Sequence, residues 1–166
     1  MPPLSSAHGF RLARFLPYRL SVIAEQVSRL VARTYADRFA LSTPEWRVIA
    51  HLGYSTSLSA LTIAERTAMD KVKVSRALAR LTDRGIVRRE VNPLDQRGAL
   101  LALTPPGRAL YEQIVPAALE TERGILAALD PADLAHLERI LGLLETHVAE
   151  LCDAQTAPKS PLEAQG

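Results

Sequence analysis

The sequence predicts a mainly α-helical fold with a small β-hairpin, and three observations support this prediction. Along most of the 166 residues, apolar side chains recur every three or four positions, which is the period of a helix with one buried face. Residues 86–103 instead contain two short strand-like runs on either side of a loop with Pro and Gly, which is typical of a hairpin. Hydrophobic residues make up 48% of the chain, enough for the core of one domain with extensions.

We expect residues 1–14 to form a flexible arm and residues 15–38 to form a long amphipathic helix. The helix is predicted from side chains spaced three and four positions apart along one stripe. This stripe consists of Leu16, Leu20, Ile23, Val27, Leu30, Val31 and Thr34.

A second helix is predicted to begin after Ser42. Ser42 and Glu45 have the spacing of a capping box, in which each side chain bonds the backbone amide of the other residue. Pro44 suits the first turn of a helix. We expect Gly53 to end this helix, because glycine is a poor helix former.

Two further short helices follow, with Ser59 predicted to cap the third and Asp70 the fourth. Gly85 supplies the left-handed residue that commonly ends a helix. Two short helices joined by a tight turn, the second basic near its start, are typical of a helix-turn-helix that reads a major groove. The inward positions of the fourth helix are Val74, Ala77, Leu78 and Leu81. Its outward positions are Lys71, Lys73, Ser75, Arg76 and Arg80.

Residues 86–91 and 99–103 are the predicted strands of the hairpin. Directly after a recognition helix, such a hairpin is the wing of a winged helix-turn-helix, which we expect over residues 42–104. At its tip, Arg97 can enter a narrow minor groove, where the negative potential is enhanced, while Asp95 holds the guanidinium in place. An ordinary surface pair of Asp and Arg is the alternative interpretation.

Positive charge is concentrated in residues 70–97, where eight Lys/Arg stand against four Asp/Glu, a net charge of +4. The whole chain carries only +2. Residues 105–166 hold four Lys/Arg and ten Asp/Glu, a balance that would repel a nucleic acid. Because DNA is held by local neutralisation of phosphates, residues 70–97 are the predicted DNA-binding segment. A solvated charged face is the alternative that charge alone leaves open.

Several short motifs, in this order along the chain, resemble the MarR family of winged helix-turn-helix transcription regulators. They are Ala64-Glu65-Arg66, Val74-Ser75-Arg76, Gly85-Ile86-Val87 with Arg89, Asp95-Gln96-Arg97, and Leu103-Thr104 with Gly107. The resemblance covers about residues 15–151 and implies an obligate homodimer that binds a short pseudo-palindrome in double-stranded DNA. Val72 and Lys73 replace the small hydroxyl residues that are frequent in the family, and Gly98 loosens the wing loop, so base preference is not carried over.

The residues expected to contact double-stranded DNA lie in the helix-turn-helix and in the wing. In a recognition helix, side chains near the N-terminus reach base edges, while hydroxyl groups and exposed cations hold phosphates. The predicted contacts are Ser59, Lys71, Val72, Lys73, Ser75, Arg76, Arg80, Arg89, Asp95 and Arg97.

Two helices are predicted over residues 105–151, with Pro116 inside the first and Asp130-Pro131 at the start of the second. Together with the helix over residues 15–38, they offer more apolar surface than the small winged core can cover. We therefore expect a two-fold homodimer that presents two recognition helices to successive major grooves, about 34 Å apart. Residues 152–166, rich in Pro, Ala, Gln and Ser, are predicted to be a disordered tail.

The family resemblance implies a small effector between the dimer helices and the winged module. Segments 15–21, 44–51 and 66–71 are similar to family members that control aromatic-acid catabolism, including sensors of hydroxycinnamoyl-CoA thioesters. This implies a small aromatic acid or an acyl-CoA, whose ring would pack on aromatic side chains and whose charge would bind arginine. In the alternative interpretation, Trp46 anchors the core and the arginines are solvated or contact the second copy. The candidates are Tyr18, Arg19, Arg33, Arg38, Trp46, Arg47 and His51.

A repressor released by its effector, which changes the spacing of the two recognition helices, is the first functional hypothesis. A redox-responsive regulator that uses Cys152 and a winged module that binds other proteins remain alternatives. No catalytic arrangement of Ser/His/Asp or Cys/His, no metal-ligand cluster and no phosphate loop is evident, so neither an enzyme nor a cofactor is expected. Without an apolar run of membrane-spanning length or a signal peptide, we expect no membrane contact and a cytoplasmic location.

Overall fold

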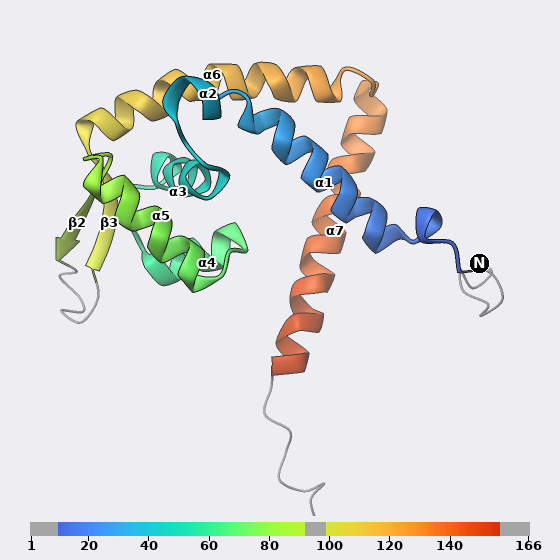
Figure 1. Cartoon of the computed structure of the whole chain (residues 1–166). Helices are drawn as coiled ribbons and strands as arrows, with labels where there is room; N and C mark the ends of the chain where they lie inside the picture. Colours follow the sequence, from blue (N-terminus) through green and yellow to red (C-terminus); the bar gives the residue numbers. More distant parts are fainter. Residues whose placement is uncertain (1–9, 92–98, 157–166) are drawn as a thin grey trace, which may run out of the picture. The chain divides into compact units, whose positions relative to one another are not determined.

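The structure is a computed structural model that describes residues 10–91 and 99–156 (Figure 1). The chain divides into two compact units, residues 1–123 and 124–166, and each is described by itself. Most described residues are helical, and strands β1, β2 and β3 form an antiparallel sheet in the order β1-β3-β2. The predicted fold class, mainly α with a small β-wing, is confirmed.

The first unit begins with a 3₁₀ turn, η1 (Leu12–Arg14), followed by α1 (Leu16–Ala32) and the short helix α2 (Ala36–Phe39). The turn η1 lies within the stretch that was predicted to be a flexible arm. No residue of α1 is buried within the single chain, although its sequence carries an apolar stripe.

The prediction of one continuous helix over residues 15–38 is wrong, because the chain breaks between α1 and α2. The amides of Arg33, Thr34 and Tyr35 bond carbonyls three residues earlier, which tightens the last turn of α1. The Thr34 hydroxyl donates to the Val31 carbonyl at 2.7 Å. The side chain of Tyr35 is buried in the core, so burial of this ring competes with continuation of the helix.

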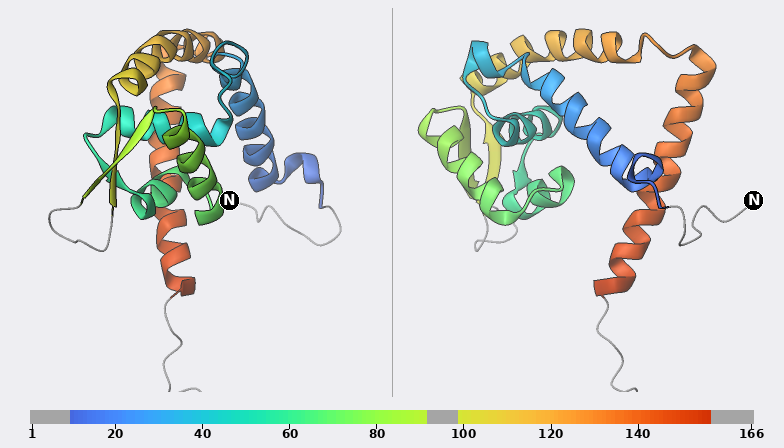
Figure 2. Two further views of the ribbon diagram at one scale, coloured as in Figure 1. Left: turned by 60° about the vertical axis from the view of Figure 1, so that its left-hand side comes forward. Right: turned by 45° about the vertical axis from the view of Figure 1, so that its right-hand side comes forward.

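The rest of the first unit up to residue 103 is what we call the winged module. Its helices pack against one another, and all three also contact the sheet (Figure 2). The elements of the winged module are α3 (Thr43–Tyr54), β1 (Leu58–Ser59), α4 (Ala60–Thr67), α5 (Lys71–Asp83), β2 (Val87–Val91) and β3 (Ala99–Leu103).

A common hydrophobic core joins all three helices of the winged module to the sheet and to α6. Because the side chains come from both local and distant segments, the core fixes the relative positions of α3, α4 and α5. The fully buried side chains of largest volume are Tyr35, Ile49, Leu52, Ile63, Leu81, Ile114, Val48, Val74 and Val87.

Two features of the winged module differ from the prediction. The prediction that Gly53 ends the second helix is wrong, because α3 continues to Tyr54. Gly53 instead makes room for the Tyr111 ring, since an added Cβ would lie 2.4 Å from Tyr111 Cε2. The strand β1 was not predicted. It exists because Leu58 pairs with Leu101 of β3, a contact between segments more than 40 positions apart.

The helix α6 (Pro105–Leu126) starts in the first unit and contains Pro116, as predicted. In the second unit, α7 (Pro131–Thr156) begins after Asp130, whose carboxylate accepts a hydrogen bond from the Asp133 amide at 2.8 Å. Because α7 reaches Thr156, the predicted boundary of a disordered tail at residue 152 is wrong. In residues 10–91 and 99–156, no helix is long and apolar enough to span a membrane.

Candidate nucleic-acid interface

The helix α5 is held at both ends by local hydrogen bonds. At its start, the Asp70 carboxylate accepts a bond from the Lys73 amide at 2.8 Å, and this bond lowers the pKa of Asp70 below its ordinary value. At its end, Gly85 has a φ of 67°, and its amide donates to the Thr82 carbonyl at 2.9 Å. The predicted caps at Asp70 and Gly85 are confirmed.

The two faces of α5 differ sharply in burial and charge. Lys73 pairs with Asp70 at 3.1 Å, whereas within the described part of the chain Arg76 and Arg80 have no hydrogen bond or ion pair. These guanidinium groups are therefore available to an external anion. The buried residues of α5 are Val74, Ala77, Leu78 and Leu81, as predicted. Its exposed candidates for DNA contact are Lys71, Val72, Lys73, Ser75, Arg76 and Arg80.

A cap holds the start of α4, and a buried side chain lies in the turn between α4 and α5. Ser59 caps α4, as predicted: its hydroxyl accepts a bond from the Thr62 amide at 3.0 Å and lies 2.9 Å from the Thr62 hydroxyl. Between the helices, Ala68 adopts a left-handed φ of 51° and Met69 is buried in the core. Because Ser59 already has two partners, its first role is to hold α4.

The wing places one arginine outward without a described partner. In β2, Arg89 is exposed and lies opposite Leu101 of β3, while Arg88 forms hydrogen bonds with Glu90, with 2.8 Å between Arg88 Nε and Glu90 Oε1. Arg89 is therefore the freer of the two cations. The predicted residues Asp95 and Arg97 lie outside the described residues.

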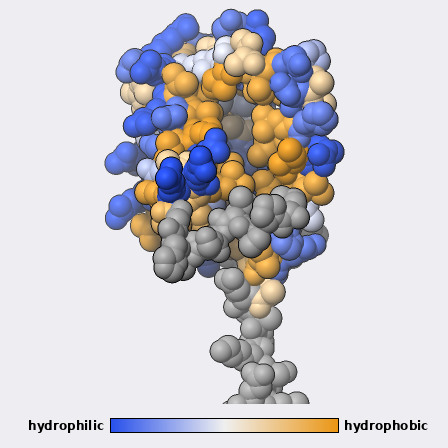
Figure 3. Space-filling model, turned by 90° about the vertical axis from the view of Figure 1, so that its right-hand side faces the viewer, coloured by the Kyte–Doolittle hydropathy of each residue, from blue (hydrophilic) through white to orange (hydrophobic). Residues whose placement is uncertain are grey.

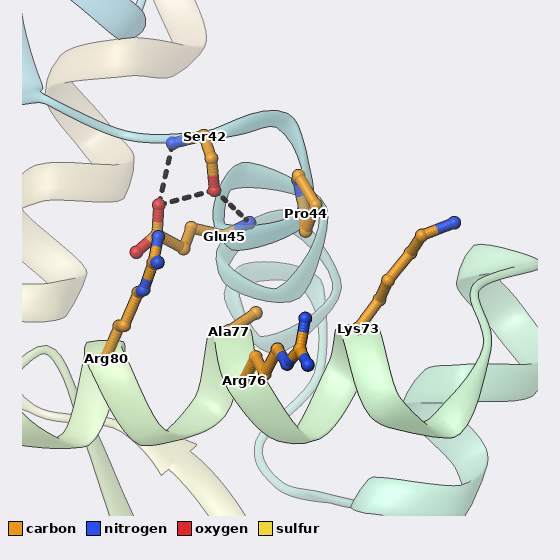
Figure 4. Close-up of a pocket in the computed structure, with 7 residues that line it drawn as sticks. All are labelled: Ser42, Pro44, Glu45, Lys73, Arg76, Ala77 and Arg80. Atoms are coloured by element: carbon orange, nitrogen blue, oxygen red, sulfur yellow. Dashed lines mark hydrogen bonds between the residues drawn. The ribbon is translucent and has the colours of Figure 1, made fainter.

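A pocket of about 220 Å³ lies between the first turn of α3 and the exposed face of α5 (Figure 4). In Figure 4, the long side chains of Lys73, Arg76 and Arg80 extend from α5, and Ser42, Pro44 and Glu45 line the opposite wall at the start of α3. The lining residues are Ser42, Pro44, Glu45, Lys73, Arg76, Ala77 and Arg80.

A buried carboxylate forms part of this pocket. Glu45 is only 4% exposed, and its Oε2 accepts bonds from the amide and the hydroxyl of Ser42 at 2.7 and 2.5 Å. The sequence predicts this capping box, which is confirmed, but it does not predict that the box faces cations of α5. That juxtaposition comes from the packing of α3 on α5, for which the sequence carries no local signal.

Comparison with known proteins gives the same assignment for this segment. Residues 41–98 match the model of the MarR family. The HTH-type transcriptional regulator PecS of Dickeya dadantii is 27% identical over 132 residues, which cover 78% of this chain and 79% of PecS. A probable transcriptional regulator from Pseudomonas aeruginosa is 28% identical with a TM-score of 0.71, over 81% of this chain and 99% of that protein. A MarR/EmrR family regulator from Acinetobacter sp. ADP1 has the same fold, with a TM-score of 0.78 at 24% identity over 85% and 99% of the two chains.

The chain is thus similar to winged-helix transcription regulators of the MarR family. The MarR-type match begins at Leu41, just before α3, and includes α4, α5 and the first strand of the wing. The matched relatives are named as transcription regulators rather than enzymes, as the sequence predicts.

The candidate effector residues of this chain are spread over several elements. Tyr18 and Arg19 are exposed on α1, Arg33 is exposed beyond its end, and Arg38 of α2 lies over the Phe39 ring at 5.1 Å. None of the contacts among described residues joins Tyr18 or Arg19 to the candidates on α3. The structure therefore does not bring these candidates together into one described site.

On α3, the structure favours a structural role for Trp46. Its ring stacks on Tyr35 and on Tyr111, with centroid distances of 5.4 and 6.3 Å, and it packs against the core. Arg47 reaches the Thr67 carbonyl at 3.5 Å. His51 is half-buried, and this burial, together with the positive charge of Arg66, lowers the pKa of His51 from its ordinary value.

Proposed function

We propose that this MarR-type protein is a homodimeric repressor that binds double-stranded DNA with α5 in the major groove and leaves the DNA when it binds a small effector. The observation that carries the proposal is that the guanidinium groups of Arg76 and Arg80 have no partner among the described residues and stand on a helix whose opposite face is buried. A rigid helix with free cations on its outer face can hold phosphates and reach base edges at the same time.

The proposed contacts divide by chemistry along α5 and the wing. Lys71 and Lys73, in the first turn, neutralise phosphates, while Arg76 has the fork geometry that matches the O6 and N7 atoms of guanine. Arg89 is placed to reach the backbone beside the groove. From the sequence alone, we propose that Arg97 enters the minor groove and that Asp95 orients it.

The test compares Arg76→Ala with the control Arg123→Ala, which removes one exposed arginine on α6. Fluorescence anisotropy would use a duplex selected from a randomised library and an unselected duplex of the same length. If Arg76 reads a base, the substitution weakens binding to the selected duplex by about 1–3 kcal/mol and relaxes base preference at one position. An equal loss on both duplexes would make Arg76 a phosphate contact, and no loss for either Arg76→Ala or Arg80→Ala would contradict the assignment of α5.

The second copy is proposed from the uncovered apolar residues of the long helices. In Figure 3, apolar residues gather on the face that the view shows. A face of this kind in a MarR-type protein fits a two-fold interface in which the same residues of both copies meet. Exposed apolar residues of α1 and α7 include Leu16, Leu20, Ile23, Leu30, Leu137, Ile140, Leu141, Val148 and Leu151.

For the effector, the pocket against α5 supports a small aromatic acid rather than its CoA thioester. Its volume of about 220 Å³ is below the roughly 300–1,000 Å³ of sites for drug-sized ligands, so one ring with a carboxylate fits better than a molecule that carries an adenosine diphosphate. Lys73, Arg76 and Arg80 can pair with the carboxylate. An acid bound there would compete with DNA for the same cations.

Direct competition and a change of dimer spacing can be separated by one measurement. A competing acid weakens binding to an isolated half-site as much as to the full site, whereas a spacing change weakens only the full site. Calorimetry and anisotropy with p-coumarate and p-coumaroyl-CoA would supply both readings. Neither heat of binding nor release of DNA with these ligands would contradict the proposed effector class.

A further inference from the structure

Arg84, at the C-terminal end of α5, bonds a distant part of the chain. Its Nη2 donates to the Phe39 carbonyl at 2.9 Å, and its Nη1 donates to the Ala40 carbonyl at 3.1 Å. One guanidinium thus joins the end of the recognition helix to two consecutive carbonyl groups that lie 44 and 45 positions earlier in the sequence. No expectation from the sequence assigned Arg84 a partner.

The two carbonyl groups lie at the junction through which the chain passes from α1 into α3. Phe39 is the last residue of α2, and Ala40 leaves the helix in a left-handed conformation with a φ of 50°. Carbonyl groups at the end of a helix have no partner within it, so an external donor is needed. The junction is also anchored by Tyr35, whose ring is buried and whose hydroxyl bonds the Thr43 hydroxyl at 3.2 Å.

The hydrogen bonds of Arg84 restrict the orientation of α5, which is otherwise held by apolar packing. Through Val74, Leu78 and Leu81, α5 packs into the core, and apolar packing depends on area rather than on direction. The guanidinium is a planar fork with fixed donor directions, so two bonds to successive carbonyl groups define an orientation. A rotation of the α2 junction against α5 has to break at least one of them.

We propose that Arg84 is a positioning residue that holds α5 at a set orientation to the junction leading to α1. This inference rests on the proposed function, in which α1 contributes to the dimer and α5 to DNA binding. In that dimer, the Arg84 contact sets how strictly the distance between the two recognition helices is kept. Arg84 itself contacts neither bases nor phosphates in this role.

The experiment measures tolerance to half-site spacing. A duplex selected from a randomised library is compared with versions that have one base pair inserted or removed between the half-sites, and with an isolated half-site. One base pair turns a half-site by about a tenth of a helical turn, so we expect the wild-type protein to lose about tenfold or more in affinity for the altered spacings. For Arg84→Ala, that loss should shrink to about threefold or less, with half-site affinity unchanged.

Two further variants separate positioning from charge and from folding. Arg84→Lys keeps the charge but lacks the fork, so it should behave as Arg84→Ala does. Ala40→Gly keeps every charge and accepts the left-handed conformation, so it should loosen the junction and relax spacing in part. Arg123→Ala serves as the control for the loss of one positive charge.

Each outcome decides the inference. If Arg84→Ala weakens half-site binding and Arg84→Lys restores it, Arg84 is a phosphate contact and the inference is overturned. The inference is also overturned if Arg84→Lys and Ala40→Gly discriminate spacing as the wild-type protein does, even where Arg84→Ala fails to fold. A wild-type protein without specific DNA binding would overturn the proposed function instead.

Discussion

The winged module and the long helices α1 and α7 use apolar residues in opposite ways. In the winged module, α3, α4 and α5 each place side chains in one core, and Val48, Ile63 and Leu81 are fully buried. In α1 no residue is buried, and Leu141 of α7 remains 41% exposed. Since both regions have the same apolar spacing in the sequence, periodicity identifies a helix but not what covers it. The winged module closes its core within one chain, whereas α1 and α7 leave most of their apolar side chains exposed.

The largest effect should come from placing a charge on the apolar stripe of α7. Leu141→Asp removes burial worth about 1.5–3 kcal/mol in each copy and adds a carboxylate, so the dimer dissociation constant should rise by more than about a hundredfold. Analytical ultracentrifugation measures this change. Far-UV circular dichroism should show less helix, while the core of the winged module stays folded.

Leu143→Asp is the matched control for this prediction. Leu143 is 61% exposed and lies off the stripe formed by Leu137, Leu141, Leu144 and Val148. The same substitution at this position should therefore leave the dimer nearly intact. Equal dissociation in both variants, or a dimer that survives Leu141→Asp, would mean that α7 is not an interface helix.

Gly107→Ala tests the other side of the comparison, because Gly107, in the first turn of α6, packs closely against Ile86 of the winged module. An added Cβ would lie 2.1 Å from the Ile86 carbonyl oxygen, where Thr104 also bonds the Gly85 carbonyl at 2.6 Å. The first turn of α6 would have to move away from β2, which should lower the free energy of unfolding by about 3 kcal/mol. Urea unfolding followed by Trp46 fluorescence measures it.

Gly124→Ala is the corresponding control in α6. No heavy atom lies within 4 Å of an added Cβ at this position, so helix propensity alone should leave the protein unchanged or stabilise it by up to about 1 kcal/mol. If both substitutions have the same effect, close packing of Gly107 against β2 is not what limits the stability of the winged module.

The parts of this protein that follow from local chemistry could be predicted from the sequence. The caps at Ser42, Ser59, Asp70 and Gly85 depend on residues at most four positions apart, and the structure confirms them. The four buried residues of α5 could be predicted for the same reason, because a spacing of three and four residues is a property of the helix itself.

The features that depend on distant contacts could not be predicted. The strand β1 exists only through its pairing with β3, and the need for a glycine at position 53 comes from the Tyr111 ring, which leaves no room for a Cβ there. The pocket beside α5 and the bonds from Arg84 to the α2 junction likewise join segments 28 or more positions apart. A single sequence has no local signal for such pairs.

Val72 departs from the pattern of the winged module, because it is apolar and 58% exposed in the first turn of α5. In the proposed complex, its methyl groups pack on a thymine methyl group. Replacing that thymine by uracil in the selected duplex removes one methyl group and should cost about 0.8 kcal/mol, or roughly fourfold in affinity. With Val72→Ala, the same replacement should cost almost nothing. An equal cost for both proteins would show that Val72 reads no methyl group.

The smallest effect concerns His51, whose environment inside the winged module penalises its charged form. Burial and the charge of Arg66 lower the pKa of His51 in the folded chain, so the unfolded chain binds the proton more readily. Stability should therefore fall as the pH drops below about 6.5 and level off once the folded protein is also protonated. Because His51 is only half-buried, solvent still screens its charge, and the change should stay below about 1 kcal/mol.

Thermal unfolding between about pH 5 and 8 detects this change, in a window above the range in which carboxylates such as Asp70 titrate. His51→Gln should remove the pH dependence that belongs to this group. Arg66→Gln should reduce it only in part, because burial is the larger cause and remains. If His51→Gln keeps the wild-type slope, the dependence arises elsewhere.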